Sequence, residues 1–482
     1  MLRAASAATV LVALAACGTG PRALSTAPTT AADAPAQWNA PLPHRGELTA
    51  LTSWWQQFDD PVLVGLIDAA QVASPTIASA ASRIAQSRTA RVASGAALLP
   101  SLDANANALR GKQDLVRGLG NSAGLGLQAA WEIDLFGGRR AARDAAQARL
   151  DGAQAGWHDA RVAVAAELAT NYTSLRACEA QVEQTRADSH SRNETARLTD
   201  LSTRAGFESP ANAALARASA AQGNGLLTQR RAQCDVLVKG LVALTGVDEP
   251  TLRARLAPNA ARLPQPAPIA LAGVPAQALA QRPDLSFAER EVVAASAEVS
   301  QAQAARLPRI ALNGSISASR FESSEFGNQS GMLWAIGPLT VSLPLFDGGT
   351  RRANVVAAQA RYDEATLLYR GKLRNAVREV EEALVALQST ADRSTDAQVA
   401  TDGFAASFRG TEARFKGGLA SLYELEDARR SALQAEIALT DLQRERATAW
   451  ITLYRALGGG WSEADSVHGG VSKPSTTSVA AQ

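Results

Sequence analysis

The sequence predicts a mostly α-helical protein that also carries membrane β-strands and is built as an internal tandem duplication. Three observations predict this fold class. Marker residues recur at fixed offsets, a stretch without proline runs from Arg139 to Thr203, and shorter segments alternate apolar with small or polar side chains. Aromatic residues make up only 5% of the 482 residues, while hydrophobic residues reach 46%. This composition suits long, closely packed helices better than a core of bulky side chains.

The duplication is visible in residues that return in the same order along the chain. The earlier markers lie 208 positions apart and the later ones 212 apart. The matched pairs are Pro75 and Pro283, Leu99-Pro100 and Leu307-Pro308, Arg139-Arg140 and Arg351-Arg352, Ala145–Arg149 and Ala357–Arg361, and Gly206 and Gly418. Collinear repetition predicts a first structural repeat over 46–260 and a second over 261–461. Each repeat is expected to hold a helix, a strand pair, a very long helix, a tip and a long return helix.

A strand pair is expected between the Leu-Pro and Phe-Gly markers of each repeat. Apolar residues alternate with small or polar ones from Leu125 to Ile133 and from Ile310 to Ala318. This period of two is typical of membrane β-barrels and also of half-buried strands in soluble proteins. Two repeats supply four strands, too few to close a barrel, so copies of the chain would have to share one. A dimer would give a narrow, filled barrel, whereas a trimer would leave a channel.

The N-terminus carries targeting information. Residues 1–16 hold one early arginine and an apolar run, which predicts a secretory signal peptide too short to span a bilayer. Leu14–Cys17 resembles the bacterial lipobox, so Cys17 is expected to become a lipidated N-terminus, and the glycine after it favours the outer membrane. The alternative is an ordinary signal followed by a chance cysteine. Residues 17–45 are predicted to be a flexible tether and 462–482 a disordered tail.

The long helices are expected to fold back as antiparallel hairpins with Gly206 and Gly418 at their tips. Apolar residues recur at spacings of three and four, as in coiled coils, and a soluble coiled-coil scaffold would show the same pattern. Cys178 precedes Gly206 by 28 positions and Cys234 follows it by 28, so a hairpin would bring the two cysteines level. An oxidising compartment then favours a disulfide, with two unpaired buried thiols as the alternative.

Several function classes are disfavoured by the sequence. Lysine and arginine (48) nearly balance aspartate and glutamate (46), so no basic field indicates a nucleic-acid partner. The four histidines are scattered, and no nucleophile–base pair, metal cluster or phosphate loop is recognisable, which argues against an enzyme, a metal site and a cofactor. The glycine-rich run 118–124 is expected to form a turn between strands.

Specific motifs carry a resemblance to a known family. They are the opening Trp54-Trp55 with Phe58 and Asp60-Pro61, the two Leu-Pro pairs, Asp134–Gly138 and Pro344–Gly349. With the duplication and the lipobox, they resemble the outer membrane factors, the TolC-like ducts of tripartite efflux pumps, and specifically the NodT-type lipoproteins. The resemblance covers nearly the whole chain, from Trp54 to Trp461. Phe136 and Phe346 are expected to seat the turns from strand to long helix.

The resemblance implies a homotrimer. A twelve-stranded β-barrel in the outer membrane, with four strands from each chain, would continue into a long α-helical coiled-coil barrel. It also implies a channel without enzymatic activity or cofactor that is lipid-anchored in the cell outer membrane and extends into the periplasm. This channel would passively conduct small molecules from an inner-membrane transporter, of the RND or a related type, through a periplasmic adaptor (membrane fusion) protein. A duct for one-step protein secretion and a periplasmic scaffold without a pore remain alternatives.

The resemblance further implies which residues act at the periplasmic end. The tips expected to contact the adaptor are Arg204, Gly206, Phe207 and Ser209 in the first repeat and Lys416, Gly418, Leu419 and Ser421 in the second. Glu424 and Asp427, three apart on one helix face, match positions where the family places acidic rings at the periplasmic aperture. Three copies near the axis would repel anions and attract cations. The alternative is a solvated helix face with Arg429 and Arg430 nearby.

Overall fold

The computed structural model describes residues 34, 35, 37–40, 51–112, 119–266, 269, 278–323 and 327–461. The predictions for the signal peptide, for Cys17, for most of the tether and for the tail concern residues outside this set. The chain divides into two compact units. Of the described residues, unit 1 takes those in Ser82–Gln154 and Ser286–Gly371, and unit 2 takes those in Thr30–Ala81, Ala155–Leu285 and Lys372–Gln482. Each unit therefore combines segments from both predicted repeats.

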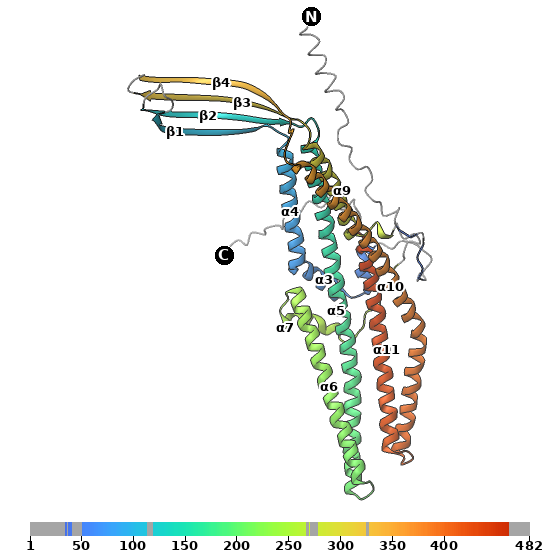
Figure 1. The fold of residues 1–482 in the computed structure, drawn as a ribbon. Coiled ribbons are helices and arrows are strands. Elements are labelled where there is room, and N and C mark those ends of the chain that lie inside the picture. Colours follow the sequence, from blue (N-terminus) through green and yellow to red (C-terminus); the bar gives the residue numbers. More distant parts are fainter. Residues whose placement is uncertain are drawn as a thin grey trace. The chain divides into compact units, whose positions relative to one another are not determined.

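The long helices repeat one order of elements twice, with nearly equal lengths (Figure 1). Helices α4 (Pro75–Ala96) and α9 (Pro283–Ala304) span 22 residues each, and α5 (Gly138–Arg204) and α10 (Thr350–Lys416) span 67 each. The return helices α6 (Pro210–Thr245) and α11 (Leu422–Ala456) span 36 and 35 residues. Prolines begin α4, α6 and α9 because the first turn of a helix does not need their missing N–H.

The remaining helical elements among the described residues are short. They are η1 (Leu51–Phe58), α3 (Pro61–Ala73), α7 (Glu249–Leu256), η2 (Ala257–Asn259) and η3 (Gly458–Gly460). Among the residues that the structure describes, no single helix is both long enough and apolar enough to cross a membrane, while the bent pair of α3 and α4 passes that test jointly, by length and composition alone.

Aspartates cap the starts of both 67-residue helices. The backbone N–H of Arg139 donates to Asp134 Oδ1 at 3.0 Å, and that of Arg140 donates to Asp134 Oδ2 at 2.9 Å. Asp347 caps α10 in the same way, accepting from the N–H of Arg351 at 3.2 Å. A carboxylate at this place satisfies N–H groups that the helix cannot pair internally. The aspartates of the two Phe-Gly motifs are therefore signals for the beginning of a helix.

Unit 1 contains a four-stranded antiparallel sheet in the order β1-β2-β3-β4, drawn as four arrows in Figure 1. The strands are β1 (Ser101–Lys112), β2 (Leu119–Ile133), β3 (Arg309–Ser323) and β4 (Gly327–Ser342), two from each repeat. The register places Leu127 between Ala104 and Ile316, and Ile316 opposite Trp334. Because successive side chains point to opposite faces, the alternating apolar residues of all four strands share one face.

Two expectations about the connections in unit 1 are wrong. Gly120 and Gly124, expected in a turn, lie within β2. A Cβ at Gly124 would lie 2.7 Å from Oδ1 of Asn107 on β1, so glycine here permits a close approach between strands. Phe346, expected to seat the turn before α10, is 92% exposed, and the positive φ angles of the glycines that follow carry the chain onward without burying it.

The core of unit 2 joins the long helices to the short N-terminal elements. Trp54 is fully buried, stacks on Tyr454 with ring centroids 5.0 Å apart, and meets Phe58 edge-on at 4.9 Å. Asp60 caps α3 and also accepts a hydrogen bond from the hydroxyl of Tyr172 on α5. Trp54 and Asp60 thus attach the segment before α3 to Tyr454 in the second repeat and to Tyr172 in the first. These contacts explain why the sequence carries Trp-Trp and Asp-Pro at this place.

Candidate functional site: the hairpin tips and the two-faced sheet

The two hairpin tips have the same backbone geometry. Gly206 has a φ of 81° and Gly418 a φ of 72°, a conformation that disfavours any side chain. The N–H of the residue after each glycine bonds back to a carbonyl in the last turn of the preceding helix, at 2.9 Å in the first tip and 2.8 Å in the second. Ser209 and Ser421 then cap the return helices through their side chains. Glycine and serine at the tips are thus needed for the reversal itself.

Each tip presents an apolar side chain beside a cation. Phe207 is 88% exposed and Leu419 is 74% exposed. The cations are ion-paired on their own helices, Arg204 with Asp200 at 2.6 Å and Lys416 with an acidic residue one turn earlier at 3.2 Å. Large apolar side chains at a sharp turn add nothing to the chain's own core, so these two are available to a partner.

Glu424 and Asp427 differ in what holds them. Glu424 belongs to a capping box: its Oε2 accepts from the N–H of Ser421 at 2.7 Å and from the serine hydroxyl at 2.8 Å. The backbone N–H of Ser421 lowers the pKa of Glu424 below its ordinary value. Asp427 pairs with Arg430 at 2.6 Å, and both side chains are more than half exposed. The Ser-x-x-Glu spacing signals this cap in the sequence, but neither the aperture role nor the solvated-face alternative for Glu424 included it.

A buried ionic cluster lies between the two hairpins of unit 2. Glu426 on α11 accepts from Arg192 on α5 at 3.2 Å and from Ser219 on α6 at 2.5 Å, and it also pairs with Arg429. Arg429 is only 3% exposed and donates to Thr195 on α5 at 2.9 Å. This cluster was not predicted from the sequence, and the burial of Arg429 does not fit the alternative of a solvated helix face around it. The buried neighbours Leu425 and Ala432, four before it and three after it, are the signal that could have predicted its burial.

The first hairpin carries a covalent link. Cys178 on α5 and Cys234 on α6 form a disulfide with a Cα–Cα distance of 5.7 Å. This pairing is the one that their equal distance from Gly206 predicts. The bond fixes the register of the two helices over the whole length between the cysteines and the tip.

The two faces of the sheet differ in chemistry. On one face the side chains of β4 are large and apolar, and Ile336 is 83% exposed. The other face carries small and polar side chains, among them Asn105, Asn107 and Ser315. An exposed apolar face of this extent is unusual on a protein surface surrounded only by water. Within the described residues, β1 and β4 are the edges of the sheet.

Comparison with known proteins gives these features a context. The family model of outer membrane efflux proteins matches residues 66–247 and 274–459. The pyoverdine export outer membrane protein OpmQ of Pseudomonas putida is 31% identical over 92% of this chain and 95% of its own length. The toluene efflux pump outer membrane protein TtgI of Pseudomonas putida is 30% identical over 90% of this chain and 94% of its own.

Solved structures show the same architecture. A structure of the outer-membrane channel OprN aligns with a TM-score of 0.81 and 27% identity, and the match covers 92% of this chain and all of that one. The predicted fold class is thereby confirmed, as are the outer membrane location and a role as an efflux channel rather than an enzyme. The chain belongs to the outer membrane efflux protein family.

Proposed function

We propose that three copies of this chain form one duct, which passively conducts small molecules out of the cell. The observation that supports this best is the sheet with one exposed apolar face, one polar face and two edge strands. In lipid, backbone groups at a sheet edge must find partners, and a neighbouring copy supplies them. Twelve strands would then close a barrel with apolar side chains toward lipid and polar ones toward water.

The energy and the cargo come from partners. An inner-membrane transporter, of the RND or a related type, would load the duct through a periplasmic adaptor. The tips are the contact points, centred on Phe207 and Leu419, because both project from tight turns and are largely exposed. The cations beside them, Arg204 and Lys416, would steer an acidic or polar partner surface. The names of the relatives, pyoverdine export and toluene efflux, favour small molecules over secreted proteins as cargo.

Two further assignments complete the proposal. Cys17 would carry the lipid that anchors the N-terminus in the outer membrane. Asp427, with Glu424, would form an acidic ring in the trimer at the periplasmic aperture, where their exposed carboxylates would favour cations.

The experiment that tests the proposal is conductance in planar lipid bilayers, combined with the mass of the purified detergent complex. A trimer with discrete, cation-preferring channel events is the expected result. A monomer without channel activity would refute the duct and favour the scaffold. Translocation of a polypeptide through the duct, with no export of small molecules in cells, would favour protein secretion instead.

A further inference from the structure

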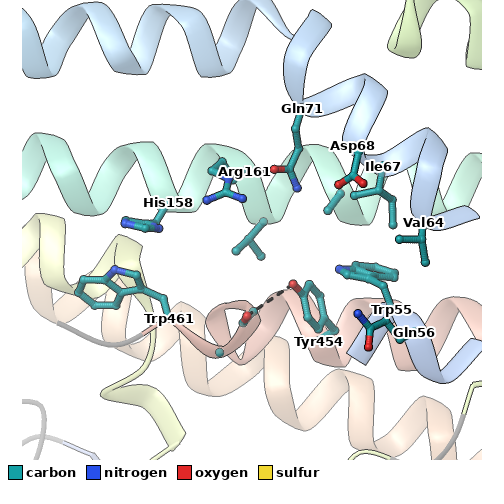
Figure 2. Close-up of a pocket in the computed structure, with 14 residues that line it drawn as sticks. Trp55, Gln56, Val64, Ile67, Asp68, Gln71, His158, Arg161, Tyr454 and Trp461 are labelled. Atoms are coloured by element: carbon teal, nitrogen blue, oxygen red, sulfur yellow. Dashed lines mark hydrogen bonds between the residues drawn. The ribbon is translucent and has the colours of Figure 1, made fainter. Parts of the chain in front are cut away.

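Unit 2 contains a cavity that is separate from the hairpin tips and from the sheet. It has a volume of about 520 Å³ and lies between η1, α3, α5 and the segment after α11 (Figure 2). This volume is within the range of small-molecule sites. The wall between the polar groups is apolar, formed by residues such as Ile67, Val162 and Ala165.

Aromatic rings line both ends of the cavity. At one end Trp55 meets Tyr454 with ring centroids 4.6 Å apart, and at the other His158 faces Trp461 at 6.1 Å. The Tyr454 hydroxyl donates to the Gly459 carbonyl at 3.5 Å, drawn as the dashed line in Figure 2. Burial raises the pKa of Tyr454 above its ordinary value, so this hydroxyl stays neutral.

One donor in the lining is buried without an acceptor. Trp461 is 6% exposed, and its indole Nε1 has no hydrogen-bond partner among the described residues. Buried N–H groups are nearly always paired, so an unpaired one beside a cavity indicates an acceptor that is not among the described residues.

A positive charge is held on the same cavity wall. Nε of Arg161 donates to Oε1 of Gln71 at 2.9 Å, and its guanidinium lies 4.9 Å from the ring centre of Trp157. These two contacts restrict the arginine to this wall, as Figure 2 shows for Arg161 and Gln71. The carboxylate in the lining, Asp68, is exposed and lies nearer the Trp55 end in Figure 2.

We propose that this cavity binds a small organic carboxylate with an apolar body. Its carboxylate accepts from Trp461 Nε1 and pairs with Arg161, and its body lies against the apolar wall toward Trp55 and Tyr454. A neutral ligand of the same shape would lose the ion pair, and an ammonium ligand would meet the fixed guanidinium.

The test is titration calorimetry of the full-length detergent-solubilised protein with benzoate and with neutral benzamide as the matched probe. Benzoate is expected to bind at least about tenfold more tightly than benzamide. Arg161→Gln should abolish this preference, and Trp461→Phe should weaken both probes about fivefold to tenfold while leaving the preference in place.

Matched variants outside the cavity control for effects of the same substitutions on folding and overall charge. Trp450→Phe and Arg455→Gln change the same residue types on α11 but do not line the cavity, so both should bind benzoate as the parent chain does. No binding of either probe would mean that water satisfies the Trp461 N–H, and this would overturn the proposal. Binding that emerges only after residues 462–482 are removed would overturn it too, because the chain itself would then be the occupant.

Discussion

Arg192 on α5 and Glu426 on α11 form an ion pair at 3.2 Å with side chains only 11% and 14% exposed. Glu426 also accepts from Ser219 and pairs with Arg429, so one carboxylate connects both helices of the first hairpin to the return helix of the second. Removing one partner from such a cluster leaves buried charge without compensation. The relative placement of the hairpins near their tips therefore depends on Glu426.

Glu426→Gln is expected to destabilise the protein by about 3 kcal/mol, because the buried Arg429 loses its ion-pair partner and Arg192 keeps only Asp188. The measurement is thermal unfolding followed by circular dichroism at one fixed scan rate. Glu382→Gln is the matched control, since its ion pair with Arg378 is more than half exposed on both sides and should change stability by less than about 1 kcal/mol. Equal effects of the two variants would contradict the role given to the cluster.

The disulfide between Cys178 and Cys234 closes a loop with a sequence separation of 56 residues. A crosslink of this span is expected to stabilise the protein by about 4 kcal/mol through the unfolded chain. Mass spectrometry of non-reduced peptides should find the two cysteines joined, and reductant should lower the melting temperature of the parent chain but not that of a Cys178→Ser, Cys234→Ser variant. Two thiols that can both be alkylated in the native protein would refute the pairing.

The aperture assignment is separable from the helix cap that Glu424 provides. Glu424→Gln keeps a side chain that completes the capping box but removes the charge, whereas Glu424→Ala removes both. Glu424→Gln with Asp427→Asn is expected to lower cation preference in bilayers without loss of thermal stability. Glu424→Ala should in addition lower the melting temperature, because the capping box is lost. Unchanged ion preference in the Gln and Asn variant would discard the aperture role and leave Glu424 as a cap alone.

The pH dependence follows from the same cap. The hydrogen bonds from Ser421 lower the pKa of Glu424 in the folded chain. The cap therefore contributes its full stability at pH values above 4.5, the ordinary pKa, and loses it as pH falls through the lower folded-state pKa. Cation preference should therefore persist at pH 4.5 and decline below it. Ser421→Ala removes the hydroxyl that bonds the carboxylate, and should move this decline to higher pH. Coincident titrations in the two proteins would show that the cap does not influence the aperture charge.

The sequence was sufficient for features that depend on local chemistry. Gly206, Gly418, Ser209 and Ser421 mark the ends of helices because a tight turn and a helix cap need those residue types, whatever surrounds them. The strand faces were also predictable, because a period of two assigns each residue to one side.

Features that depend on long-range packing were not predictable in this way. Arg429 is buried and bonds to Thr195 on α5, whereas its neighbour Arg430 is exposed and pairs with Asp427 on its own helix, a difference set by how α11 packs on α5. The cavity between Trp55, His158 and Tyr454 takes its walls from segments far apart in the sequence. Phe346 shows a further limit, because its motif does not indicate that the side chain is left 92% exposed in the chain.

Neighbouring positions on β4 provide the sharpest test of the two-faced sheet. Ile336 pairs with Gly314 on the apolar face, and Ala335 pairs with Ser315 on the polar face. A lysine that faces lipid near the centre of a membrane strand costs about 2–4 kcal/mol, whereas one that faces water is tolerated. Ile336→Lys is therefore expected to reduce the amount of assembled trimer in outer membranes, measured by heat-modifiable migration in gels.

Ala335→Lys should assemble normally and instead lower the cation preference of the channel, since three new positive charges would line the water-filled side. If Ala335→Lys failed to assemble and Ile336→Lys were tolerated, the assignment of the two faces would be inverted. Equal tolerance of both variants would contradict insertion of this sheet into lipid.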